Sequence, residues 1–445
     1  MQDAKWIFSP LSDGIPLRIP VCHRACPALP PHGMNCSACH VGAVDIFAKG
    51  PNVVISRQQE AIEMSNPRIK LGMVGGGRDA FIGAVHRIAS RIDDQFELVA
   101  GCFSSTAEKS KASGADLGLP EDRVYSDFTA MAQREARLKN GIDAVAIVTP
   151  NHVHYPAARE FLKRGIHVIC DKPLTSTLPD ARKLAKAAEA SKAVFVLTHN
   201  YTGYPLVREA RDMVHSGKLG NVRVVQVEYP QDWLSEPLEA SGQKQAGWRT
   251  DPAKSGAGGS IGDIGTHAYN LARFITGLPL DSLSADMQCF VEGRELDDNA
   301  HVLLRFAGGA RGMLWSSQVA SGSENALRIR VFGTKGGLEW QQEDPNKLWY
   351  TPLGEPKRLL TRNGAGTGPA SAAVSRIPPG HPEGYLEGFA TIYSEAATAI
   401  RAANSGSEAE GLLYPTVQDG LEGVAFVDAC VRSSKRDGAW VKLAL

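Results

Sequence analysis

Three widely separated residues carry side chains suited to proton transfer and to stabilising negative charge: Lys172, Asp263 and His267. Lys172 follows the apolar stretch 165–170 and precedes Pro173, which disfavours a helix at the lysine. Asp263 and His267 are four residues apart, so a helix would place them on one face. Histidine accepts a hydroxyl proton near neutral pH, a carboxylate orients it, and an ammonium group stabilises an alkoxide. These residue types predict chemistry at a hydroxyl or carbonyl carbon.

Each of these features also has an ordinary structural interpretation. A lysine before a turn is usually a solvated surface residue. An aspartate four residues before a histidine can be a helix N-cap beside a core histidine. The glycine-rich run 256–262 favours the functional interpretation of Asp263, because glycines let the backbone approach another group closely.

A strand, glycine turn and helix pattern begins at residue 69 and would position a cofactor near these groups. Apolar periodicity predicts a strand over 69–74 and a helix over 81–92, with glycines between them. Such a turn lets a pyrophosphate reach the amide groups at the start of the helix. Gly75 and Gly77 fit the dinucleotide-binding spacing, and Gly83 is the better third glycine if the turn is three residues longer. A glycine-rich flexible loop is the alternative.

The end of the second predicted strand, 96–103, bears on the choice of cofactor. Ser104 stands where NAD-selective sites usually place a carboxylate for the ribose 2′-hydroxyl. Lys109 and Lys111 follow, and their charge suits a 2′-phosphate, which mildly favours NADP. The serine can equally be a helix N-cap, so NAD and NADP both remain open.

Polar residues also close the later predicted strands, 144–148 and 194–197. The carboxyl ends of parallel strands meet at one edge of a sheet, so we expect these side chains to face a ligand. For Asn151 the competing interpretation is a turn made with Pro150. The predicted cofactor contacts are Gly75, Gly77, Gly83, Ser104, Thr149, Asn151, His154 and Asn200, and the predicted substrate contacts are Tyr201, Trp248 and Arg249.

The order of the predicted elements indicates two domains. Strands alternate with helices over 67–200, which predicts an α/β, Rossmann-type doubly wound parallel sheet. Over 201–445, strands punctuated by glycines predict an α+β domain with a large, mostly antiparallel sheet and C-terminal helices. One face of that sheet is expected to mediate a homo-oligomer. The segment 362–383 is predicted to be either a loop over a site or a solvated linker.

Composition excludes several function classes. The 48 basic residues balance 48 acidic ones, so we expect no nucleic-acid partner and no membrane surface. No apolar run approaches the length of a membrane span, and the first thirty residues lack a signal-like apolar region, which predicts a cytoplasmic location. The expected partner is a small polyol or sugar, and no metal is expected at the catalytic site.

The composition of residues 1–66 predicts an irregular extension that is either disordered or not native. In the second case, the natural chain would start at Met64. Four cysteines there are compatible with a zinc site, and Cys36, Cys39 and His40 fit the spacing for covalent haem, although no export signal accompanies them.

From residue 69 onward the chain resembles the Gfo/Idh/MocA oxidoreductases, named for glucose-fructose oxidoreductase and inositol dehydrogenase. The resemblance implies a two-domain fold, NAD(P), and hydride transfer between nicotinamide and a secondary alcohol or ketone of a sugar, cyclitol or related polyol. It also implies catalytic roles for Lys172, Asp263 and His267. Asp171 departs from the commoner glutamate. A catalytically silent, NAD(P)- and sugar-binding regulator of the same fold is the alternative. The motifs that carry the resemblance are the glycine turn, Thr149-Pro150-Asn151 with His154, Asp171-Lys172-Pro173, Trp248-Arg249, Gly258-Gly259 with Asp263 and His267, and the run 415–420.

Overall fold

The computed structural model describes residues 67–78 and 80–445. The segment 1–66, with its cysteine motifs and the predicted start at Met64, lies outside the described residues.

The first sheet has five parallel strands in the order β2-β1-β3-β4-β5. Its apolar strands are covered on both faces, and every residue of β3 is buried, as expected for a parallel sheet. The order reverses between β1 and β3, so a ligand crevice is expected at their carboxyl ends. The predicted doubly wound sheet is confirmed. The strands are β1 (Ile69–Gly75), β2 (Phe96–Cys102), β3 (Ala144–Val148), β4 (His167–Cys170) and β5 (Phe195–Leu197).

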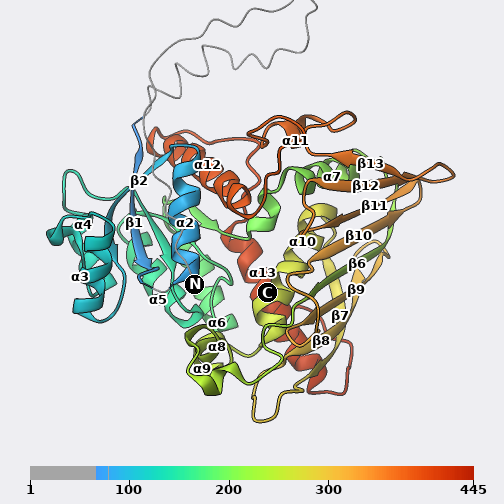
Figure 1. The fold of residues 1–445 in the computed structure, drawn as a ribbon, viewed down its shortest axis with the longest axis horizontal. Coiled ribbons are helices and arrows are strands. Elements are labelled where there is room, and N and C mark those ends of the chain that lie inside the picture. Colours follow the sequence, from blue (N-terminus) through green and yellow to red (C-terminus); the bar gives the residue numbers. More distant parts are fainter. Residues whose placement is uncertain (1–66, 79) are drawn as a thin grey trace, which may run out of the picture. The chain divides into compact units, whose positions relative to one another are not determined.

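The helices of this half follow the strands in alternation (Figure 1). The turn considered for Pro150 and Asn151 is the start of a helix, in which Pro150 is the N-cap and Asn151 the first residue. The helical elements are α2 (Phe81–Ile92), α3 (Ala107–Asp116), η1 (Glu121–Arg123), α4 (Phe128–Glu135), α5 (Asn151–Leu162), α6 (Leu178–Glu189) and η2 (Asn200–Gly203).

One cover of the parallel sheet comes from the far end of the sequence. Helix α12 (Tyr385–Asn404) lies beside α2, and its residues Phe389, Ile392 and Tyr393 share an apolar core with Met73 and Ala146 (Figure 1). The chain therefore returns to the parallel sheet after building the second sheet.

The second sheet has eight strands in the order β13-β12-β11-β10-β6-β9-β8-β7, and only β6 and β9 pair in parallel. Its inner face packs on α7 and α10 in the largest apolar core of the described residues. The predicted mostly antiparallel sheet is confirmed. The strands are β6 (Val222–Pro230), β7 (Leu280–Gln288), β8 (Asn299–Phe306), β9 (Arg311–Ser317), β10 (Arg328–Gly333), β11 (Gly336–Gln341), β12 (Lys347–Pro352) and β13 (Arg358–Thr361).

The remaining helical elements connect or cover this sheet. They are α7 (Pro205–His215), η3 (Leu238–Ser241), α8 (Lys244–Arg249), α9 (Pro252–Ser255), η4 (Ile261–Gly265), α10 (Thr266–Thr276), α11 (Pro369–Ala372) and α13 (Val417–Ser434). Across residues 67–78 and 80–445, none of the helices has both the length and the apolar character needed to cross a membrane.

Candidate active site

Lys172 and Asp263, 91 residues apart in sequence, form an ion pair at the carboxyl end of β4. The Lys172 Nζ donates to Asp263 Oδ1 at 2.9 Å and to the Asp263 carbonyl oxygen at 2.7 Å. The second carboxylate oxygen of Asp263 accepts from Arg249 Nε at 3.2 Å and from Gln318 Nε2 at 3.0 Å. Burial alone would raise the pKa of Asp263, but Lys172 and Arg249 outweigh it and hold that pKa well below its usual range. The carboxylate is therefore ionised and fixed.

His267 lies one turn further along, on α10, among aromatic rings. Its ring is 4.9 Å from that of Tyr201 and 6.2 Å from that of Tyr229, and its Nδ1 is 3.5 Å from Nδ1 of His199. Burial lowers the pKa of His267 well below its ordinary value, and the charge of Lys172 lowers it further. The imidazole is therefore neutral near neutral pH and available as a proton acceptor.

The expected pairing of Asp263 with His267 is replaced by a different arrangement. Although the two residues are four apart, the Asp263 carboxylate turns to two cations, Lys172 and Arg249. Opposite charges in a buried site attract more strongly than a neutral imidazole does, which accounts for the difference. Among the described residues, the ring that lies against His267 Nδ1 belongs to His199.

The Asp171 side chain fixes the backbone of Lys172 by a hydrogen bond. Its Oδ1 accepts from the Lys172 amide at 2.9 Å and from Thr198 Oγ1 at 3.0 Å. Burial would raise the pKa of Asp171, but nearby His86 and Lys172 more than compensate, so the pKa is lowered. The aspartate side chain, although shorter than that of glutamate, still fixes Lys172.

The glycine turn after β1 leaves no room for side chains. Gly75 has φ +84°, and a Cβ there would lie 2.7 Å from the Val148 carbonyl oxygen. Gly83, in the first turn of α2, packs against Gly76, where a Cβ would lie 2.3 Å from the Gly76 Cα. The third glycine of the motif thus brings helix and strand together.

A crevice of about 1480 Å³ runs from this turn to the ion pair. It contains two buried polar atoms that have no hydrogen-bond partner in the described structure, Thr149 Oγ1 and Asn200 Nδ2. Buried polar groups are rarely left unpaired, so these atoms indicate a bound ligand with donors and acceptors. Together with the glycine turn, they fit a dinucleotide. Of the predicted cofactor contacts, Gly75, Gly77, Ser104, Thr149, Asn151 and Asn200 line the crevice.

The other two predicted cofactor contacts, Gly83 and His154, lie behind the crevice wall. The two ring nitrogens of His154 are 2.8 Å and 2.9 Å from the carbonyl oxygens of Pro173 and Thr149, and burial lowers its pKa. His154 therefore ties together the loops that follow β3 and β4. Asn151 faces the crevice, but its amide donates to the Ser255 carbonyl oxygen at 2.9 Å.

The three predicted substrate contacts reach the crevice from two elements: Tyr201 from η2, and Trp248 and Arg249 from α8. Tyr201 is buried, with its hydroxyl 2.5 Å from that of Tyr229. The Arg249 guanidinium stacks over Trp248 at 4.3 Å and over Trp233 at 5.8 Å from the ring centroids. The crevice end near Asp263 thus offers aromatic surface and fixed donors, the groups that bind polyols.

Sequence analysis did not identify several residues at this end. His199 contacts His267, Gln318 binds Asp263, and Tyr229 hydrogen-bonds Tyr201. His199 could have been found, because it lies just after β5, at the same sheet edge as Lys172. Gln318 directly follows β9, and nothing in its local sequence indicates that it contacts Asp263.

Comparison with known proteins places the whole described chain in one family. Residues 69–199 match the oxidoreductase family with an NAD-binding Rossmann fold, and residues 207–339 match the GFO/IDH/MocA C-terminal domain. The uncharacterized oxidoreductase YfiI of Bacillus subtilis is 35% identical over 84% of this chain and 96% of its own length. A crystal structure of an oxidoreductase from Sinorhizobium meliloti is 65% identical, covers 85% of this chain and 100% of that one, and gives a TM-score of 0.77.

An inositol dehydrogenase homolog from Azotobacter vinelandii, solved with NADH and myo-inositol, is 37% identical over 84% of this chain and 97% of that one, with a TM-score of 0.79. These matches agree with the two-sheet fold. This chain belongs to the Gfo/Idh/MocA family of oxidoreductases, whose N-terminal half is an NAD-binding Rossmann domain.

Proposed function

We propose that this protein is an NAD(P)-dependent dehydrogenase that transfers a hydride between nicotinamide and a secondary carbinol of a cyclitol, sugar or related polyol. One observation carries the proposal: Lys172, Asp263 and His267 all line the crevice that begins at the glycine turn. The Azotobacter homolog that binds NADH and myo-inositol supports this substrate class.

His267 is the proposed general base. Its Nδ1 faces His199, which leaves Nε2 to accept the proton of a substrate hydroxyl. Burial and Lys172 keep the ring neutral, so it can take that proton near neutral pH. The bound cofactor supplies the hydride acceptor for oxidation and the hydride donor for reduction.

Lys172 is the proposed electrostatic partner of the reacting oxygen. Its Nζ is held by two oxygen atoms of Asp263, so one further hydrogen remains for a substrate oxygen. A fixed ammonium stabilises the negative charge that develops on that oxygen during oxidation. Asp263 is a positioning residue for Lys172 and Arg249, and Asp171 holds the lysine backbone.

The cofactor proposal includes use of NADP as well as NAD. Ser104, Ser105 and Lys109 line the crevice at the end of β2, where hydroxyl groups and a cation suit a 2′-phosphate. Glu108 also lines it, and its charge opposes that preference. The two cofactors are therefore to be compared directly.

The test is a panel of inositols, hexoses, pentoses and methyl glycosides assayed with NAD and with NADP, following the absorbance of the reduced nicotinamide. Turnover of one or more polyols, lost in Lys172→Met and in His267→Gln, is the expected result. Binding of cofactor and polyol without turnover of any panel member would contradict the dehydrogenase proposal and indicate a regulator.

The outer face of the eight-stranded sheet is proposed to join copies of this chain. Leu303 pairs with Met313 across β8 and β9, and Val224 pairs with Phe332 across β6 and β10; all four are at least 38% exposed. An apolar face of this kind marks an interaction surface. Light scattering should give an oligomer for the wild type and a smaller species for Leu303→Glu; a monomeric wild type would contradict the proposal.

A further inference from the structure

A second cavity, of about 880 Å³, adjoins the catalytic crevice. We call it the side cavity. Four residues line both spaces, Glu324, Asn325, Gln342 and Tyr385, so the two are adjacent. Its volume lies within the range of about 300–1,000 Å³ typical of small-molecule sites. A group attached to a molecule in the crevice can therefore extend into the side cavity.

The border between the two spaces is rigid and begins close to His267. Asn325 Oδ1 accepts from the Tyr229 hydroxyl at 2.7 Å and from Gln231 Nε2 at 2.6 Å, while its Nδ2 donates to Gln342 Oε1 at 2.8 Å. The Tyr229 ring is 6.2 Å from that of His267. The polar groups at the border are thus fixed relative to the proposed base.

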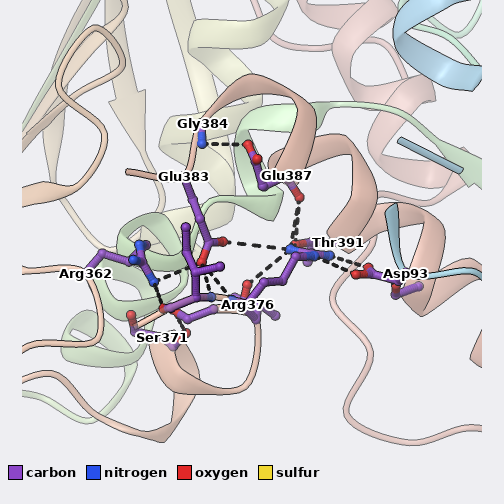
Figure 2. Close-up of polar contacts among 12 residues, drawn as sticks. Asp93, Arg362, Ser371, Arg376, Glu383, Gly384, Glu387 and Thr391 are labelled. Carbon is purple, nitrogen blue, oxygen red and sulfur yellow. Dashed lines mark hydrogen bonds and ion pairs between the residues drawn. The ribbon is translucent and has the colours of Figure 1, made fainter. Parts of the chain in front are cut away.

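The far wall of the side cavity is fixed by Glu383, which is 4% exposed. Its Oε1 accepts from the Arg376 and Ile377 amides at 2.7 Å and 3.1 Å and lies 2.9 Å from Arg362 Nη1. Figure 2 shows that Arg376, which contacts Glu383, also reaches Asp93. Arg376 Nη2 and Asp93 Oδ2 form an ion pair at 2.5 Å. The segment 362–383 is therefore anchored to the nucleotide-binding half and is no solvated linker.

One lining residue of the side cavity, Tyr204, carries a buried hydroxyl. Tyr204 is 1% exposed and lines the side cavity, and its hydroxyl makes no hydrogen bond of ordinary length with the described residues. Burial raises the pKa of Tyr204, although the Gln342 amide approaches closely enough to oppose the effect. The Tyr204 hydroxyl therefore lies inside the cavity wall, beside Gln342.

The lining favours a neutral, hydroxyl-rich ring over a cation. Amide and carboxylate oxygens accept from sugar hydroxyls, and the half-buried ring of Tyr385 offers apolar surface for a sugar face. Two of the lining carboxylates already pair with cations: Asp344 lies 2.8 Å from Lys347, and Glu383 binds Arg362.

We propose that the side cavity binds a second sugar ring, so that the preferred substrate is a disaccharide or a glycosylated polyol. The inference rests on the proposed function, because the first ring must occupy the catalytic crevice beside His267. The side cavity then acts as a specificity site that a single-ring polyol leaves empty.

The test fills the side cavity from Gly384, whose added Cβ would meet no atom within 4 Å. Maltose, lactose, trehalose and galactinol are compared with glucose, galactose and myo-inositol. For the wild type, kcat/KM for at least one two-ring substrate should exceed that for its single-ring counterpart about tenfold or more. Gly384→Trp should reduce this ratio about tenfold, whereas the matched control Gly384→Ala should leave it within about twofold. A wild-type preference for single rings, or equal ratios in both variants, would overturn the proposal.

Direct binding separates this inference from the proposed function. Calorimetric titration of the same disaccharides into NADH-saturated Lys172→Met and Lys172→Met/Gly384→Trp protein needs no turnover. Disaccharide binding that Gly384→Trp abolishes supports the side-cavity site even if no panel member is oxidised, in which case only the dehydrogenase proposal fails. Turnover of single-ring polyols with no binding of any disaccharide has the opposite meaning: the dehydrogenase proposal stands, and the side-cavity proposal is overturned.

Discussion

Replacing Lys172 by methionine should damage catalysis and stability through two separable effects. The methionine keeps most of the volume but removes the charge that binds Asp263 Oδ1 at 2.9 Å and the Asp263 carbonyl oxygen at 2.7 Å. Losing one preorganised donor to a developing oxyanion typically lowers kcat by about 10²–10³-fold, which is about 3–4 kcal/mol. We expect a fall of that size, with the Kd for NADH changed less than about threefold.

The loss of stability in Lys172→Met follows from the Asp263 carboxylate, which stays buried after its partner is removed. Breaking a buried ion pair from one side costs about 3–5 kcal/mol, because an uncompensated charge stays behind. Here Asp263 keeps Arg249 Nε at 3.2 Å and Gln318 Nε2 at 3.0 Å, so we expect a smaller loss, about 2–3 kcal/mol. The double variant Lys172→Met/Asp263→Asn removes the stranded charge and should regain at least about half of that loss without regaining kcat.

The assay combines urea unfolding, steady-state kinetics and fluorescence titration of NADH. Lys183→Met is the control, because Lys183 forms an exposed pair with Asp180 in α6, and such pairs contribute about 0–1 kcal/mol. A Lys172→Met enzyme with kcat within about threefold of the wild type would refute the catalytic reasoning. A double variant no more stable than Lys172→Met would refute the electrostatic one.

Two further predictions use buried groups of the site. Asn200→Leu removes an unpaired buried amide, so the ligand-free protein should gain about 1 kcal/mol in urea unfolding while the Kd for NADH rises about tenfold; an unchanged Kd would mean that Asn200 does not touch the cofactor. Burial lowers the pKa of His199 to about 3, so only the unfolded chain takes up this proton as the pH falls from about 6.5 towards 3. His199→Gln should therefore lose about 2 kcal/mol less stability than the wild type between pH 7 and about pH 5, and parallel losses would contradict the assignment.

Local patterns predicted the fold well where periodicity was strong. The strand and helix expected over 69–74 and 81–92 are β1 and α2, and the two-residue period beyond residue 222 gave the antiparallel sheet. Helix α4 and strands β7, β11, β12 and β13 were missed. Strand β7 carries several polar residues, including Asp281 and Asp286, which obscure the alternation of apolar and polar residues that predicts a strand.

The candidate site was predictable only in part. Lys172 and Asn200 could be placed because they lie just beyond β4, which ends at Cys170, and β5, which ends at Leu197, and these strand ends share one sheet edge. The partner of Asp263 could not be predicted from the sequence. His267, four residues away, and Lys172, 91 residues away, compete for its carboxylate, and the outcome depends on burial and distance in the folded protein. Gln318 was missed for a related reason, since its contact with Asp263 joins the end of β9 to η4, 55 residues away in sequence.

The return of α12 to the parallel sheet limits how this chain can be divided. A fragment ending near residue 200 would expose the Met73 and Ala146 side chains that Phe389 and Ile392 cover, and such bare apolar surface promotes aggregation. Exchanging the halves that contain the eight-stranded sheet between relatives therefore requires a graft with two junctions, because the recipient's own α12 must be kept with its NAD-binding domain. That helix begins at Tyr385, far downstream of residue 200.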